Sequence, residues 1–169
     1  MKYIKASATI SHCGKFRYEL TREWRQDAKC CMFIMLNPST ADGDQDDPTI
    51  KKCVGFADRL GYGRLQVFNL WAYRATNPAD LKRAGYPMGI DNWGFLVYGM
   101  EATLDTGSHI ICAWGANARG STHAHNVGIK LGLERRAPLY ALRELRDGTP
   151  EHPLMLPYSC QPKVYAPWL

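Results

Sequence analysis

The chain has 169 residues, enough to bury the core of one domain but not of two, so we expect a single domain over residues 1–169. A content of 46% hydrophobic and 22% charged residues excludes a disordered chain, and no apolar run approaches the roughly 20 residues that span a bilayer. The net charge of +5 permits a polyanionic partner, and the N-terminus lacks the apolar stretch of a signal peptide, so we expect a cytoplasmic protein without a membrane partner.

The first part of the chain, residues 1–28, predicts a hairpin-like extension. Segments 6–10 and 16–20 both show a rough alternation of apolar and polar side chains, as half-buried strands do. Gly14 lies between them at a position typical of a turn. Residues 29–169 then form the predicted α/β core and tail.

The core begins with a strand and a helix. Residues 30–36 are seven consecutive apolar residues, which is typical of a strand buried on both faces of a sheet. Asp47 is a favourable N-cap and Pro48 a favourable first residue for a helix of about a dozen residues that ends at Gly61.

Strand and helix signals then alternate along the chain. Strands are predicted at 65–70, 109–114 and 138–142, and helices starting at 78, within 89–104 and over 123–133. Alternation with short connections indicates an α/β fold with helices on both faces of a sheet. We therefore predict a three-layer α/β/α sandwich with a central, mostly parallel sheet.

Polar segments follow the predicted strands, at the end of a parallel sheet where ligands bind. Residues 37–42 follow the first core strand, 69–73 the second, 114–117 the third and 148–154 the fourth. We expect the active surface to be built from these loops.

Each of these segments also has a purely structural interpretation. Residues 37–40 could form an ordinary turn, Trp114 could fill the core, and His152 could hold the tail through a hydrogen bond. The carboxylates of residues 42–47 suit either a solvated loop or a magnesium site. These alternatives stay open at the level of the sequence.

Neither the spacing of the cysteines nor any nucleotide-binding motif indicates a cofactor. The six cysteines contain no C-x-x-C spacing, so we predict reduced, mostly buried thiols rather than a disulfide framework or a metal site. Neither a P-loop nor a G-x-G-x-x-G motif occurs in the chain. We accordingly predict no metal and no cofactor.

The strand-end segments resemble those of DUF1643, a family from bacteria and their phages with no settled activity. The resemblance rests on residues 36–42, 47–50, 69–70, 113–115 and 152–154. More distantly, the chain is similar to uracil-DNA glycosylases of the mismatch-specific type. These enzymes show an Asn-Pro loop, a strand ending in Asn, a Trp-Gly strand end and a His-Pro loop in the same order, which implies their fold.

The glycosylase resemblance implies roles for the matching residues. Asn37 would position a water, Asn69 would read a base edge, and His152 would stabilise negative charge on the departing base. Breaking an N-glycosidic bond also develops positive charge on the sugar, which a nearby carboxylate stabilises. The implied catalytic residues are Asn37, His152, Asp42 and Asp47, with Asp46 a further candidate carboxylate.

An extruded base would stack on Trp71 or Tyr73 at the end of the second core strand. The implied substrate-binding residues are Pro38, Ser39, Thr40, Asn69, Trp71, Tyr73, Trp114, Gly115 and Pro153.

The resemblance thus implies hydrolysis of an N-glycosidic bond of a base, modified or not, in DNA or in a nucleotide. Asn37 stands where true uracil-DNA glycosylases carry a water-activating Asp, which favours a second hypothesis, a non-catalytic binder of nucleic acid or of a modified base. A third is a metal-dependent hydrolase that uses the carboxylates of residues 42–47.

Overall fold

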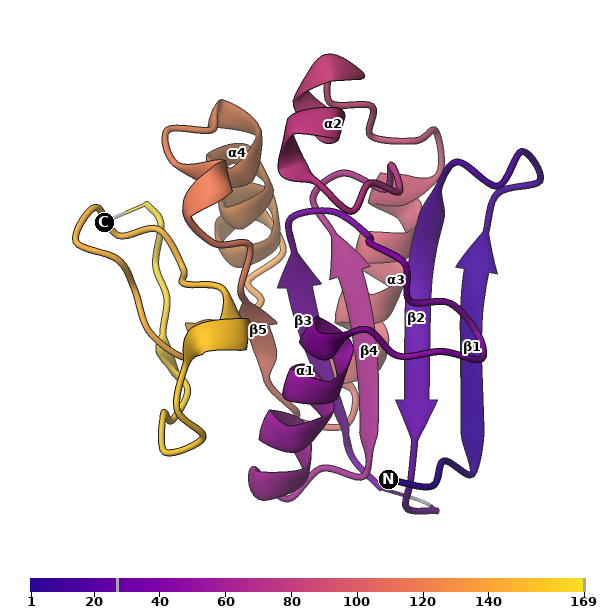
Figure 1. Ribbon diagram of the computed structural model, residues 1–169. Helices are drawn as coiled ribbons and strands as arrows, with labels where there is room; N and C mark the ends of the chain where they lie inside the picture. Colours follow the sequence, from indigo (N-terminus) through magenta and orange to yellow (C-terminus); the bar gives the residue numbers. More distant parts are fainter. Residues whose placement is uncertain (27, 169) are drawn as a thin grey trace.

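The computed structural model describes residues 1–26 and 28–168 and is built around one open sheet (Figure 1). Its strands are β1 (Lys5–Ile10), β2 (Arg17–Glu23), β3 (Cys30–Met35), β4 (Arg64–Asn69), β5 (Ile110–Cys112), β6 (Leu139–Ala141) and β7 (Lys163–Val164), in the order β1-β2-β4-β3-β5-β6-β7. The α-helices are α1 (Pro48–Arg59), α2 (Pro78–Arg83), α3 (Asn92–Leu104) and α4 (Thr122–Ile129). None of the helices in these residues has the length and apolar character needed to cross a membrane.

The α/β class is confirmed, but the sheet is mixed rather than mostly parallel. β4, β3, β5 and β6 run parallel at its centre. The pairs β1–β2, β2–β4 and β6–β7 are antiparallel. The prediction therefore holds for the four central strands only, because the N-terminal hairpin extends one edge of the sheet through β2 and the tail extends the other through β7.

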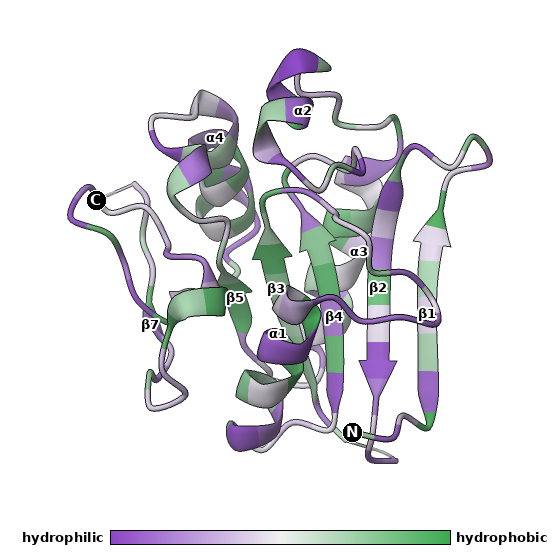
Figure 2. Cartoon of the chain, in the orientation of Figure 1, coloured by the Kyte–Doolittle hydropathy of each residue, from purple (hydrophilic) through white to green (hydrophobic). Residues whose placement is uncertain are grey.

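Helices pack on both faces of the sheet, as the alternation of side chains along β3 requires. Cys31 and Phe33 point to the face covered by α1, and Met32 and Ile34 point to the face covered by α3 and α4. Every residue of β3 is buried, as predicted for a central strand. Figure 2 shows that β3 and β5 are hydrophobic along their length.

Helix α1 begins where the sequence predicts. The Asp47 carboxylate accepts a hydrogen bond from the backbone N–H of Ile50 at 2.8 Å, and Pro48 occupies the first turn. The chain leaves the helix through Gly61, whose φ of +88° favours glycine. The cap holds Asp47 beside the carboxyl ends of the central strands.

The acidic loop before α1 is held against the hairpin by Arg22. This side chain is only 1% exposed, and its Nε donates to Asp46 at 2.7 Å. Its Nη2 donates to the backbone oxygens of Asp42 and Gln45, and the Tyr3 hydroxyl donates to the same Asp46 carboxylate. The loop that leads to Asp47 is thus fixed by a buried ion pair.

The C-terminal segment contacts both layers of helices, and it does so at glycines. A Cβ atom on Gly55 of α1 would lie 2.5 Å from the Tyr158 hydroxyl, and one on Gly128 of α4 would lie 2.6 Å from Pro167. Trp168 packs just as closely on Gly132, in the π-helical turn that follows α4. Small residues on the helices therefore allow the tail to dock.

The prediction of reduced, mostly buried cysteines is confirmed. Cys30, Cys31, Cys53 and Cys112 are buried, Cys160 is partly buried and Cys13 is exposed, and all six are free thiols.

Candidate functional site

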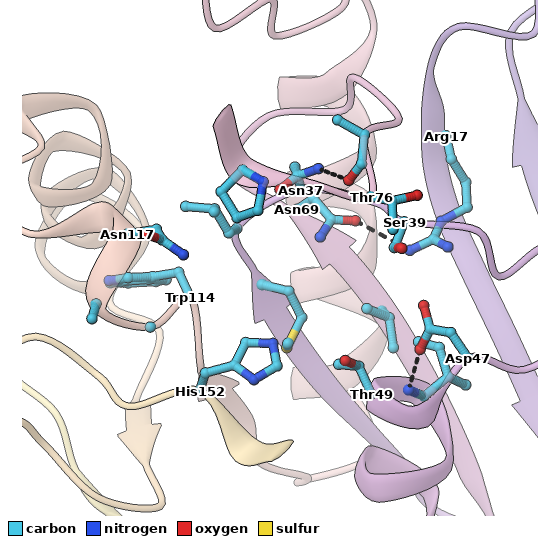
Figure 3. Close-up of a pocket in the computed structure, with 18 residues that line it drawn as sticks. Arg17, Asn37, Ser39, Asp47, Thr49, Asn69, Thr76, Trp114, Asn117 and His152 are labelled. Atoms are coloured by element: carbon cyan, nitrogen blue, oxygen red, sulfur yellow. Dashed lines mark hydrogen bonds between the residues drawn. The ribbon is translucent and has the colours of Figure 1, made fainter. Parts of the chain in front are cut away.

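A cavity of about 190 Å³ lies at the carboxyl ends of β3, β4 and β5 (Figure 3). Loops that follow these strands form its walls together with the start of α1. Its polar lining consists of Arg17, Asn37, Ser39, Asp47, Thr49, Asn69, Thr76, Asn117 and His152. The strand-end segments singled out in the sequence therefore meet around one cavity.

The structure brings together seven of the residues proposed from the sequence and places six elsewhere. The cavity is lined by Asn37, Ser39, Asp47, Asn69, Trp114, Gly115 and His152. Outside its lining are Pro38, Thr40, Asp42, Trp71, Tyr73 and Pro153.

Local packing explains where three of these residues lie. Asp42 accepts hydrogen bonds from the backbone N–H groups of the two residues at 44 and 45, which turns its carboxylate toward its own loop. Trp71 is buried against Tyr86 and His123, each with a ring separation of 5.0 Å. Tyr73 packs edge-on against Phe16. Neither aromatic ring is placed to stack on a molecule in the cavity.

Asn69, the last residue of β4, carries an unsatisfied amide in the cavity wall. The side chain is 1% exposed, and its Oδ1 accepts a hydrogen bond from Arg17 at 3.4 Å. Its buried Nδ2 has no partner among the described residues. Leaving a buried donor unpaired costs about 1–3 kcal/mol, and native proteins rarely do so without a reason. The amide nitrogen therefore has its N–H groups to offer to a ligand.

Arg17, the first residue of β2, brings a buried cation to the same wall. It is 2% exposed and donates to the backbone oxygen of Ala41 at 2.7 Å as well as to Asn69. Burial lowers the pKa of its guanidinium to about 10, an effect that nearby Asp47 opposes. The group therefore stays charged at neutral pH.

His152 faces the cavity as a neutral donor. Its Nδ1 accepts a hydrogen bond from the backbone N–H of Leu154 at 3.3 Å, which leaves the proton on Nε2. Burial lowers the pKa of the imidazole below its ordinary 6.5, although Asp47 raises it in part. Figure 3 shows the ring directed toward the cavity.

Asn37 ties two walls of the cavity together. Its Nδ2 donates to the backbone oxygens of Pro38 at 2.9 Å and Ala75 at 2.8 Å. Both amide hydrogens are thus engaged, and only Oδ1 remains to hold a water molecule.

Trp114 forms an aromatic part of the lining. Its side chain is 3% exposed and meets Tyr165 edge-on with a ring separation of 5.8 Å. Trp114 therefore packs in the core, and it also lines the cavity.

Gly115 keeps the backbone and His152 close together. Its φ is +80°, and a Cβ atom there would lie 2.8 Å from the Cβ of His152. We expect Gly115→Ala to lower the free energy of unfolding by about 1–3 kcal/mol from the strained backbone alone, and further through this clash. Gly120→Ala is the matched control, because Gly120 has a φ of +63° but no atom within 4 Å of the place that a Cβ would take. If urea unfolding shows equal losses of unfolding free energy in the two variants, the predicted clash is contradicted.

The acidic residues between 42 and 47 do not gather into one cluster. Asp42 binds its own loop, Asp46 pairs with Arg22, and Asp47 caps α1. Within residues 1–26 and 28–168, no group of three or more His, Cys, Asp or Glu side chains is arranged to hold a metal ion.

The sequence did not single out Arg17, Thr49 or Thr76 as site residues. Thr49 follows the cap of α1 and lies within segment 47–50, which carries the family resemblance. Thr76 lies in the loop after β4, beside segment 69–73. Arg17 carries no such signal, because it reaches the cavity only through the pairing of β2 with β4.

The fold and the cavity define an α/β protein with a polar pocket at the carboxyl ends of its central strands. The sequence model of the family described as "Protein of unknown function (DUF1643)" matches residues 17–154, and the chain belongs to this family. Every polar residue of the cavity lies within the matched segment. Searches among curated proteins and among solved structures found no match. The relation to uracil-DNA glycosylases stays a prediction.

Proposed function

We propose that this protein hydrolyses the N-glycosidic bond of a base in DNA or in a nucleotide, with the base held against Asn69. The observation that carries the proposal is the buried Nδ2 of Asn69, a residue that lines the cavity; this nitrogen has no partner among the described residues. A base edge offers acceptors that pair with such a donor. A site built to hydrogen-bond its ligand also rejects molecules that leave its polar groups unpaired.

The aromatic lining favours a flat ligand. Trp114 borders the same cavity as Asn69, and contact between a base and an aromatic ring is worth roughly 1–3 kcal/mol in proteins that bind single strands. The four parallel central strands and the helices on both faces are compatible with the three-layer, glycosylase-like arrangement that belongs to this proposal.

The reaction we propose uses a carboxylate and a neutral imidazole. One oxygen of the Asp47 carboxylate caps α1, which leaves the other available for the reaction. Asp47 stabilises the positive charge that develops on the sugar and takes the proton of the attacking water. Asn37 accepts a hydrogen bond from this water through Oδ1. His152 donates from Nε2 to the oxygen of the departing base, where negative charge accumulates. Water adds to the sugar carbon, and the base leaves with the bonding electron pair. The base then takes up a proton from the solvent, and Asp47 releases the proton of the water to the solvent.

A non-catalytic base-binding protein is the second candidate. The state of Asn37 favours this alternative. Both of its amide hydrogens are bound to loop oxygens, so the loop after β3 offers only one acceptor to position a catalytic water. In this alternative the same cavity binds a base in nucleic acid without cleaving it.

Base release from labelled oligonucleotides tests the proposal. The panel carries uracil, mismatched and modified pyrimidines in single and double strands. We expect His152→Ala to lower the release rate by about 10²–10³, the usual loss for one donor to a developing negative charge. His125→Ala is the matched control, because this exposed histidine lies outside the cavity. Binding without release across the panel would favour the second candidate, and neither binding nor release would contradict both.

A further inference from the structure

The amide of Asn69 has two ends that differ only in whether they donate or accept. Rotating a side-chain amide by half a turn exchanges its oxygen and nitrogen at little steric cost, so its surroundings must decide which end faces the ligand. At Asn69 the decisive neighbour is Arg17, whose Nη2 lies 3.4 Å from Oδ1. A guanidinium can only donate, so the opposite orientation would place two donors against each other.

Arg17 is itself held in place. It is buried beneath the loop before α1, where Nη1 donates to the Ala41 oxygen at 2.7 Å. Its backbone N–H donates to the oxygen of Ala72, which anchors the start of β2 beside the end of β4. Figure 3 shows the guanidinium on the side of Asn69 that carries the amide oxygen. The cation therefore offers Asn69 a fixed donor.

We infer that Arg17 is a positioning residue that fixes the Asn69 amide with its N–H toward the cavity, so that the protein selects ligands presenting a carbonyl oxygen at that point. This inference rests on the proposed base-binding function and names its substrate class as bases with a carbonyl group on the edge that meets Asn69. A base with an amino group there sets N–H against N–H and leaves the Asn69 donor unpaired.

The test compares dUMP with dCMP, which carry an oxygen and an amino group, respectively, at the same ring position. Binding is measured by titration calorimetry on the full chain. We expect the parent protein to favour dUMP by about tenfold or more, the effect of one buried donor left unpaired. Arg17→Met removes the guanidinium, allows the amide to turn and brings this ratio close to one. Arg17→Lys retains a donor and restores part of the preference.

Two further variants separate the orientation of the amide from general effects. Asn69→Asp replaces the donor with an acceptor, and we expect it to reverse the preference toward dCMP. This variant tests the inference even where Arg17→Met fails to fold. Arg74→Met removes another positive charge that acts on Arg17, while the hydrogen bond of Arg74 goes to Gly14 rather than to Asn69. This control should keep the parent ratio.

The outcomes distinguish the inference from the function on which it rests. Binding of both nucleotides with no preference, or a preference that neither Arg17→Met nor Asn69→Asp alters, overturns the role of Arg17 and leaves the base pocket standing. If neither nucleotide binds and no oligonucleotide in the panel binds, both the role of Arg17 and the proposed base-binding function are overturned. A dUMP preference lost in Arg17→Met and reversed in Asn69→Asp supports both.

Discussion

Asp47→Asn is expected to lower base release by about 10²–10⁴ while keeping the cap of helix α1. Asp47 is the one carboxylate among the described residues that line the cavity, and it also caps α1 through the Ile50 N–H. Asparagine caps a helix as well as aspartate does. The substitution therefore removes the charge and the proton acceptor and keeps the hydrogen bond.

Single-turnover release rates and thermal unfolding, measured on the same preparations, check this expectation. Asp47→Ala loses the cap as well, so we expect about 1 kcal/mol less stability in addition to the lost rate. Asp42→Asn is the matched control from the same loop, because Asp42 faces its own backbone and lies outside the cavity lining. Full activity in Asp47→Asn would place the catalytic carboxylate elsewhere.

Arg22→Met is expected to lower the free energy of unfolding by about 3–5 kcal/mol. Arg22 is 1% exposed, and the substitution leaves the Asp46 carboxylate, itself 10% exposed, without its cation. The backbone oxygens of Asp42 and Gln45 lose a donor at the same time. Because this loop leads to Asp47, we also expect weaker base binding.

Urea unfolding of a small set of variants measures the effect. Arg25→Met is the matched control, because Arg25 and Asp58 form an exposed pair at 3.6 Å with side chains 49% and 40% exposed, and such pairs contribute about 0–1 kcal/mol. The double variant Arg22→Met/Asp46→Leu removes both charges, and we expect it to lose less stability than Arg22→Met alone. Similar small losses for Arg22→Met and Arg25→Met would refute the buried network.

Local sequence signals predicted the elements around the site well. The Asp47-Pro48 pair marks the start of α1 because capping chemistry is local, and the apolar run at 30–36 marks β3 because a central strand is buried on both faces. The polar residues at strand ends then converge, since parallel strands end at the same edge of the sheet.

Features that depend on long-range pairing could not be predicted in this way. Alternation along residues 6–10 and 16–20 indicates a hairpin but not the strand that the hairpin joins, so the pairing of β2 with β4, and with it the place of Arg17, was not visible. Trp71 and Tyr73 posed a related problem. An aromatic residue after a strand can turn toward the cavity or toward the core, and contacts with Tyr86, His123 and Phe16 decide the matter here.

The docking of the C-terminal segment on Gly55, Gly128 and Gly132 has a consequence for the order of folding. These contacts join parts of the chain that are distant in sequence, in particular Gly55 and Tyr158, and contacts of this kind form after local ones because closing the intervening loop costs entropy. The pairing of β3 and β4 around α1, which positions Asp47 and Asn69, needs no residue of the tail. His152 directly precedes the segment that docks last. We therefore expect the pocket to be completed at the end of folding, so that chains in which only the β3–α1–β4 unit has formed lack its imidazole.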